Sequence, residues 1–320
     1  MLTLLLFVSG LVALVVGAEV LIRGAGSIAR AVGLSPLVVG LTVVAFGTSA
    51  PEAAVSIGSA LQGQPNLVMG NVVGSNTFNV LVILGLSAVI IPLSVHSQII
   101  RQELPIMIGT AALAVLFAFD GEVSRVEGIL LSVGLIGYTS FLVIQARAAP
   151  PSETEDLAPN EASEAANQPS LPKSLFLVAL GLVGLVVGAD WLVQACVDIA
   201  KALGMSDLVI GLTIMAAGTS LPELAASAAA ALRGQRDIAV GNIIGSNIFN
   251  ILGCLGLAAV VAPQGIAVDP SVLRFDLWVM VAAFVICVPT FLRGRDISRR
   301  EGAVFLLAYC GYTSVLLMNA

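Results

Sequence analysis

The sequence predicts an all-α membrane protein of ten transmembrane helices, arranged as two inverted five-helix repeats with broken helices at the midplane. Three observations predict this fold class. Of the 320 residues, 58% are hydrophobic and only 11% are charged, against about 25% charged in ordinary globular proteins. The apolar residues form runs of about 20, the length that crosses a bilayer as a helix. The two halves of the chain also resemble each other.

Ten apolar runs are expected to span the membrane. We interpret the first as a retained span and not a signal peptide, because it lacks a basic lead-in and its VVGAE at 15–19 recurs as VVGAD at 186–190. The expected spans are Leu2–Ile22, Pro36–Ala60, Asn66–Ile91, Leu104–Phe119, Val126–Gln145, Ser174–Ala200, Leu208–Leu232, Ile238–Val261, Leu273–Leu292 and Gly302–Met318.

The basic residues predict the orientation of these spans. Of the 14 Lys and Arg residues, eleven lie in the odd-numbered connections and three in the even-numbered ones. By the positive-inside rule, the odd connections are cytoplasmic and both termini lie outside. At the membrane boundary, Glu19 with Arg23 and Asp190 with Gln194 are expected to be anchoring pairs at helical spacing.

The fifth connection, residues 148–172, is predicted to be an acidic cytoplasmic linker between the two repeats, 1–147 and 173–320. Its Pro, Ser, Ala and Glu content is typical of an unstructured tether. It carries five acids, and without them the net charge of -6 falls to -1. The acidity therefore belongs to one segment, and nothing in the composition implies a nucleic-acid or protein partner.

An internal repeat relates the two halves. Residues 40–85 align without gaps to residues 211–256 at an offset of 171, and 25 of the 46 positions are identical. Because each half has five spans, the second copy enters the membrane from the opposite face. Inverted repeats of this kind are typical of secondary transporters with a site near the midplane.

Each repeat motif contains a span that is expected to break, at GTSAPE (47–52) and at GTSLPE (218–223). Proline removes a backbone donor and glycine loosens the helix, and in lipid such a break persists only where it lines a cavity or a site. A glutamate follows each break, at a depth where a carboxylate costs at least about 2.5–3.5 kcal/mol. No Lys or Arg lies centrally in any span, so a bound cation or a proton is the expected counter-charge. A protonated glutamate bonded between helices is the alternative.

Polar residues recur at i, i+4 and i+8, which places them on one helical face. These stripes are Thr48, Glu52 and Ser56, Asn71, Ser75 and Asn79, Thr219, Glu223 and Ser227, and Asn242, Ser246 and Asn250. Small and amide residues also hold membrane helices together without any ion. The donors are all oxygens, with no His or Cys among them, which favours Ca²⁺, Na⁺ or Mg²⁺ over zinc or copper.

The paired elements Gly-Thr-Ser-x-Pro-Glu and Gly-Asn-x-x-Gly-Ser-Asn-x-Phe-Asn resemble the alpha repeats of the cation/Ca²⁺ exchanger superfamily, most closely the prokaryotic sodium/calcium antiporters. The resemblance covers the whole ten-span layout. It implies an antiporter of a bacterial or archaeal plasma membrane that exchanges Na⁺ for Ca²⁺ by alternating access. The transported ions and the lipid bilayer are then the expected partners, and no cofactor is expected.

The resemblance also implies a ligand set. Glu52 and Glu223 are the central ligands, and the carbonyls of Thr48 and Thr219 complete the Ca²⁺ site. The implied Na⁺ sites use Ser49, Ser75, Ser220 and Ser246 with the backbone of Ala45 and Ala216, while Asn79 and Asn250 line the middle. Some relatives carry Asp at the position of Asn250, so Asn here argues against K⁺ dependence and leaves two site carboxylates.

Other functions stay open to different degrees. An H⁺/Ca²⁺ exchanger, or an exchanger of another divalent cation, is the nearest alternative, because two glutamates can trade Ca²⁺ for two protons. A cation channel is more remote, since channels usually ring a pore with identical subunits. No enzyme is expected, because the residue sets of intramembrane proteases are missing.

Overall fold

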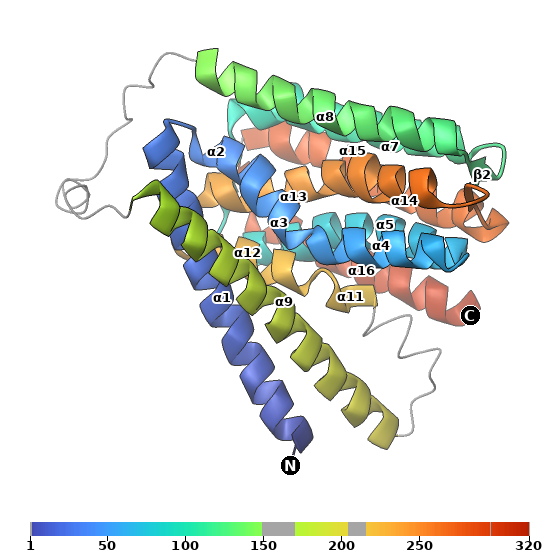
Figure 1. The fold of residues 1–320 in the computed structure, drawn as a ribbon, viewed down its shortest axis with the longest axis horizontal. Helices are drawn as coiled ribbons and strands as arrows, with labels where there is room; N and C mark the ends of the chain where they lie inside the picture. The colour runs from blue at the N-terminus through green and yellow to red at the C-terminus, as the bar shows by residue number, and fades with distance from the viewer. Residues whose placement is uncertain (1, 149–169, 204–215, 295, 320) are drawn as a thin grey trace.

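The computed structural model describes residues 2–148, 170–203, 216–294 and 296–319, which form apolar helices with two small strand pairs (Figure 1). The first half contains α1 (Leu2–Val32), α2 (Pro36–Val39), η1 (Gly40–Val44), α3 (Ala45–Thr48), α4 (Ala50–Leu61), α5 (Pro65–Phe78), η2 (Asn79–Leu84), α6 (Gly85–Ile90), β1 (Leu93–Ser94), η3 (Ile99–Glu103), α7 (Leu104–Ala118), β2 (Glu122–Val123) and α8 (Arg125–Ala148), where η denotes a π-helix. The second half contains α9 (Leu171–Ala202), α11 (Ala216–Gly218), α12 (Leu221–Leu232), α13 (Arg236–Phe249), η6 (Asn250–Leu255), α14 (Gly256–Val261), β3 (Ile266–Ala267), η7 (Val272–Asp276), α15 (Leu277–Gly294), β4 (Asp296–Ile297) and α16 (Arg299–Asn319).

The protein is a multi-pass membrane protein. Within the described residues, eight helical segments are long and apolar enough to cross a membrane, and the bent pair Pro36–Thr48 and Ala50–Leu61 can form a ninth span. The expected span Leu208–Leu232 lies partly outside the described residues, which resume at Ala216 with α11 and the short apolar helix α12.

Two predicted span boundaries are wrong. Helix α1 continues to Val32, ten residues past the expected end at Ile22. The fourth span begins with η3 at Ile99 instead of at Leu104. Glu103 does not end the span, because it is buried inside the helical segment with hydrogen-bond partners. Of the predicted linker, Ala148 ends α8, Ser170 caps α9 and Leu171 begins α9, while residues 149–169 lie outside the described part of the chain.

Helices α1 and α9 form a close pair that runs obliquely to the other helices (Figure 1). Glycines at the crossing let the two backbones touch. A Cβ added at Gly17 would lie 2.8 Å from the Leu185 nitrogen, and one added at Gly181 would lie 2.5 Å from the Leu21 nitrogen. Small residues at such positions are the usual way for membrane helices to associate.

Helix α13 lies deep inside the protein, since Ile238 to Ile248 are all buried. It packs directly on α2 and η1 through two glycines. A Cβ at Gly241 would lie 2.9 Å from the Leu37 carbonyl oxygen, and one at Gly245 would lie 2.6 Å from the Leu41 carbonyl oxygen. This contact brings α13 of the second half against the broken helix of the first half.

Two short antiparallel strand pairs link the halves outside the helices. Strand β1 pairs with β4, with Leu93 opposite Ile297, and β2 pairs with β3, with Val123 opposite Ile266. Each pair joins a connection of the first half to a connection of the second half. The third connection therefore meets the ninth, and the fourth meets the eighth.

Candidate cation-binding site

The site is built on two interrupted helices. Helix α3 ends at Thr48 and α4 begins at Ala50, with a bend of 44° between the two helical segments. In the second half α11 ends at Gly218 and α12 begins at Leu221. The predicted interruptions are thus present at both positions, and each new helix carries a proline and a glutamate in its first turn.

The two glutamates are held by serines from the opposite half of the chain. The Ser49 hydroxyl donates to Glu223 Oε1 at 2.8 Å, and the Ser220 hydroxyl donates to Glu52 Oε1 at 3.0 Å. Glu52 is 1% exposed and Glu223 is 0% exposed. Their second carboxylate oxygens, Oε2, have no hydrogen-bond partner among the described residues. These two oxygens are available as ligands, and a buried carboxylate oxygen is costly unless a proton or a cation satisfies it.

The threonines at the breaks also bond across the two halves. The Thr48 hydroxyl donates to Asn242 Oδ1 at 3.1 Å, and the Thr219 hydroxyl donates to Asn71 Oδ1 at 3.4 Å. Thr48 is buried and Thr219 is half-buried. Together with the serine–glutamate bonds, four hydrogen bonds therefore join the interrupted helices of one half to residues of the other.

The second polar stripe of each half is buried and poorly satisfied. The hydroxyls of Ser75 and Ser246, both amide atoms of Asn79 and the Nδ2 of Asn250 have no hydrogen-bond partner among the described residues. The Oδ1 of Asn250 accepts a bond from the Cys254 thiol at 3.5 Å. Cys254 therefore lies beside this amide oxygen. Buried oxygens without partners are suited to bind hard cations.

Asn79 is the first residue of the π-helix η2, and Asn250 is the first residue of the π-helix η6. A π-turn widens the helix locally, and such turns occur frequently at functional sites. The i, i+4 spacing predicts a shared face but not this widening. The two remaining predicted residues were expected to act through their backbone. Ala45 begins α3 and is buried, and Ala216 begins α11, with its side chain outside the described part.

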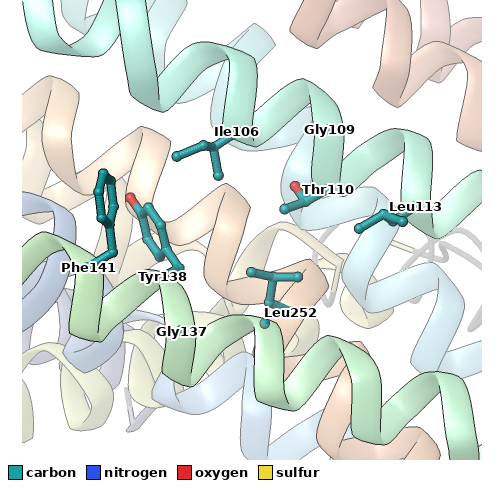
Figure 2. A pocket seen from close by; sticks show the side chains of 9 residues that line it. Ile106, Gly109, Thr110, Leu113, Gly137, Tyr138, Phe141 and Leu252 are labelled. Carbon is teal, nitrogen blue, oxygen red and sulfur yellow. The ribbon is translucent and has the colours of Figure 1, made fainter.

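A groove of about 580 Å³ lies elsewhere, between α7 and α8 (Figure 2). Its lining is apolar apart from Thr110 and Tyr138, so it offers no set of cation ligands. Leu113 and Phe141 at its edge are more than 40% exposed, as expected of a face toward lipid. Among the described residues no three His, Cys, Asp or Glu side chains form a cluster that could hold a metal ion.

Comparison with known proteins decides the family. The family model described as sodium/calcium exchanger protein matches residues 2–144 and 173–318. The chain belongs to the sodium/calcium exchanger family. This is a family of transporters and not an enzyme family.

Individual exchangers and a further membrane protein are similar over most of their length. The sodium/calcium exchanger MaX1 of Methanosarcina acetivorans is 34% identical, with 98% of this chain and 97% of MaX1 covered. The inner membrane protein YrbG of Escherichia coli is 38% identical, with 86% of each chain covered. A solved structure of the sodium-calcium exchanger NCX_Mj soaked with Na⁺ and Sr²⁺ has a TM-score of 0.84 at 32% identity and covers 98% of both chains.

The exchanger contains two further acids that the sequence does not single out. Glu103 is fully buried and accepts a bond from the Tyr138 hydroxyl at 2.7 Å, and the half-buried Asp276 accepts one from the Tyr312 hydroxyl at 2.8 Å. Each acid is the last residue of a π-helix, η3 or η7. Both acids lie at or near the boundary of an expected span, and no local signal in the sequence marks their hydrogen bonds to tyrosine.

The boundary acids of the exchanger form the predicted anchoring pairs and one pair more. Arg23 donates to Glu19 at 2.9 Å, and Gln194 donates to Asp190 at 2.7 Å. Glu19 also forms an ion pair with Arg233, which follows the last residue of α12. That third contact links the α1–α9 pair to the helix that carries Glu223.

Proposed function

We propose that this exchanger is a secondary antiporter that exchanges Na⁺ for Ca²⁺ by alternating access, with the ions bound between its two halves. One observation carries the proposal. Two buried glutamates stand at equivalent helix breaks, each fixed by a serine of the other half and each with one carboxylate oxygen that has no hydrogen-bond partner in the described part of the chain. Names of the relatives support the choice of ions, since MaX1 is called a sodium/calcium exchanger and NCX_Mj was soaked with Na⁺ together with Ca²⁺ or Sr²⁺.

The proposed Ca²⁺ ligands are the carboxylates of Glu52 and Glu223 and the backbone carbonyls of Thr48 and Thr219. The proposed Na⁺ ligands are Ser49, Ser75, Ser220, Ser246 and the backbone of Ala45 and Ala216, with Asn79 and Asn250 between them. The hydroxyls of Ser75 and Ser246 support this assignment, because neither has a hydrogen-bond partner within the residues that the structure describes. With Asn at position 250, two carboxylates serve the site, and we expect no dependence on K⁺.

We also propose ten spans in two inverted repeats, with both termini outside and the 148–172 linker in the cytoplasm of a prokaryotic cell. Three features support it. The family model matches one stretch in each half. The bonds across the halves occur in equivalent pairs. The donor or acceptor of one bond is related to that of the other by the 171-residue offset, as Ser49 is to Ser220 and Asn71 to Asn242. Each strand pair joins two odd-numbered or two even-numbered connections of the ten-span layout. Such connections lie on the same side of the membrane, as strand pairing requires.

Charge accounts for coupled exchange. Two carboxylates balance one Ca²⁺ or two Na⁺, whereas an ion-free site holds two like charges in a medium of low dielectric. At an effective dielectric constant of 20, two charges about 4 Å apart repel by about 4 kcal/mol. The ion-free, ionised site therefore resists the access change, and either ion load removes that barrier. The α1–α9 pair carries no polar stripe, which suits it to slide against the site helices during the change.

Flux measurements in proteoliposomes test the proposal. Ca²⁺ uptake should follow an imposed Na⁺ gradient and ignore K⁺ and H⁺ gradients, and Glu52→Gln should eliminate ion-coupled uptake. Ser49→Ala and Ser246→Ala should abolish Na⁺ coupling. If both serine variants keep wild-type uptake and uptake follows the H⁺ gradient, the protein is an H⁺/Ca²⁺ exchanger. Unchanged Ca²⁺ flux in Glu52→Gln would show that the glutamates only pack the helices.

A further inference from the structure

We propose that Asn71 and Asn242 are positioning residues that set the direction of the threonine hydroxyl hydrogens and so keep the carboxylates of the site available to cations. The inference rests on the proposed function and deepens it. It concerns residues that are not among the proposed ion ligands. Each of these asparagines contacts a glutamate backbone in its own half and a threonine of the other half.

The bonds of Asn242 define the arrangement. Its Nδ2 donates to the backbone carbonyl of Glu223 at 3.4 Å and to the Ser227 hydroxyl oxygen at 2.9 Å. Its Oδ1 accepts the Thr48 hydroxyl at 3.1 Å. Asn242, Ser227 and Thr48 are all 0% exposed, so water does not compete for these bonds.

The chemistry of the partners fixes the direction of every bond. A backbone carbonyl can only accept, so the NH₂ end of the Asn242 amide must face Glu223. The oxygen end then faces Thr48, and an amide oxygen can only accept as well. The Thr48 hydroxyl therefore donates its single hydrogen to Asn242 at 3.1 Å, which is shorter than its 3.4 Å distance to the Ala45 carbonyl, and the lone pairs of its oxygen stay free.

A competing acceptor makes this direction important. The Thr48 hydroxyl also lies within hydrogen-bonding reach of the Glu223 side chain. Glu223 already accepts a bond from Ser49 on Oε1. If Thr48 turned its hydrogen to the carboxylate, Glu223 would be held by two hydroxyl donors and would offer fewer lone pairs to a cation. Asn242 prevents this by accepting that hydrogen.

The same arrangement recurs in the other half. The Nδ2 of Asn71 donates to the Glu52 carbonyl at 3.0 Å and to the Ser56 hydroxyl oxygen at 2.9 Å, while its Oδ1 accepts the Thr219 hydroxyl at 3.4 Å. Thr219 also lies within hydrogen-bonding reach of the Glu52 side chain. Two independent copies of one network indicate a shared requirement of the site and not a packing accident.

The test measures binding and transport separately in the full-length protein. Asn242→Ala and Asn71→Ala should each weaken equilibrium ⁴⁵Ca²⁺ binding to the purified protein about tenfold, equivalent to about 1.4 kcal/mol. The KM for Ca²⁺ in proteoliposomes should rise by a similar factor, with the maximal rate within about twofold of wild type. The control is Ile243→Val, a small change at a fully buried apolar residue of the same helix. It should leave Ca²⁺ binding unchanged.

A variant of the threonine tests the same bond from its donor side. Thr48→Val removes the competing hydrogen, so adding Asn242→Ala to it should cause less than twofold further loss. Full additivity of the two losses, or unchanged Ca²⁺ binding in both asparagine variants, would overturn the proposal.

The two hypotheses fail in different ways. If wild type binds Ca²⁺ but its uptake ignores the Na⁺ gradient, the proposed Na⁺ coupling fails, and the binding measurements still decide the role of the asparagines. If uptake follows Na⁺ but the asparagine variants bind Ca²⁺ normally, only the positioning role is overturned. A wild-type protein that binds neither Ca²⁺ nor Na⁺ refutes both.

Discussion

Substituting Gly245 by alanine tests whether the close approach of α13 to the first broken helix sets the geometry of the site. An added Cβ would lie 2.6 Å from the Leu41 carbonyl oxygen and 2.8 Å from the Ala45 Cβ, where ordinary contact begins at 3.4 Å. Backbone atoms cannot turn aside as a flexible side chain can. Relief therefore requires α13 to move away by about 0.8 Å, and overpacking of this kind costs about 1–3 kcal/mol.

That displacement reaches the site directly. Asn242 lies one helical turn before Gly245 on α13, and its bond from Thr48 is 3.1 Å long. A shift of about 0.8 Å away from the first half lengthens it beyond 3.5 Å, where it ceases to be a hydrogen bond. Losing one partner of a buried polar pair costs about 1–3 kcal/mol. We expect the affinity for Ca²⁺ to fall about tenfold or more.

The assay is equilibrium ⁴⁵Ca²⁺ binding to purified Gly245→Ala protein, with thermal unfolding measured in parallel. Gly137→Ala is the matched control, since a Cβ at this helical glycine meets nothing within 4 Å. It should bind Ca²⁺ like wild type. A Gly245→Ala protein that is folded and binds Ca²⁺ within twofold of wild type would refute the reasoning, because the site would then tolerate a wider helix separation.

Three further outcomes follow from contacts outside the site. Arg233→Gln should lower the free energy of unfolding by less than about 1 kcal/mol, because Arg233 and Glu19 are about one-third exposed. In thermal unfolding, added salt should lower the stability of the wild type toward that of the variant. Glu103→Ala should destabilise the protein by about 1–3 kcal/mol, because the amides of Gln98 and Gln102 and the Tyr138 hydroxyl lose their acceptor. Glu103→Gln should cost less, since its oxygen can face the two amides while its NH₂ group donates to the Tyr138 hydroxyl oxygen, and an unchanged unfolding temperature in Glu103→Ala would contradict this. Gly181→Leu should separate α1 from α9 and abolish Ca²⁺ uptake, whereas Gly311→Leu, at a site where a Cβ meets nothing within 4 Å, should keep it.

Much of the site follows from local chemistry in the sequence. Pro51 and Pro222 each mark an interruption, and the i, i+4 spacing places Ser75 and Asn79 together, because both effects act within one or two helical turns. The repeat adds long-range information, since it identifies Glu52 and Glu223 as equivalent positions. The structure then places these two glutamates across from serines of the opposite half.

Other features depend on contacts that no local pattern encodes. The ion pair of Glu19 with Arg233 joins residues 214 positions apart in sequence. The π-turns that begin at Asn79 and Asn250 depend on the packing around them. Glu103 was missed for a different reason: an apolar run is bounded by its first charged residue, whereas a carboxylate with three hydrogen-bond donors can lie inside the protein.

The hydrogen bonds between the halves determine the smallest unit that can work. In an isolated first half, Glu52 would keep its place at the break but lose the hydroxyl of Ser220, and Asn71 would lose that of Thr219. Ser49 would lose its acceptor Glu223, and Thr48 would keep only the longer contact to the Ala45 carbonyl. Such a half could regain these partners only from a second copy of itself inserted upside down in the bilayer. One chain that contains both orientations removes the need for a subunit to adopt two opposite topologies.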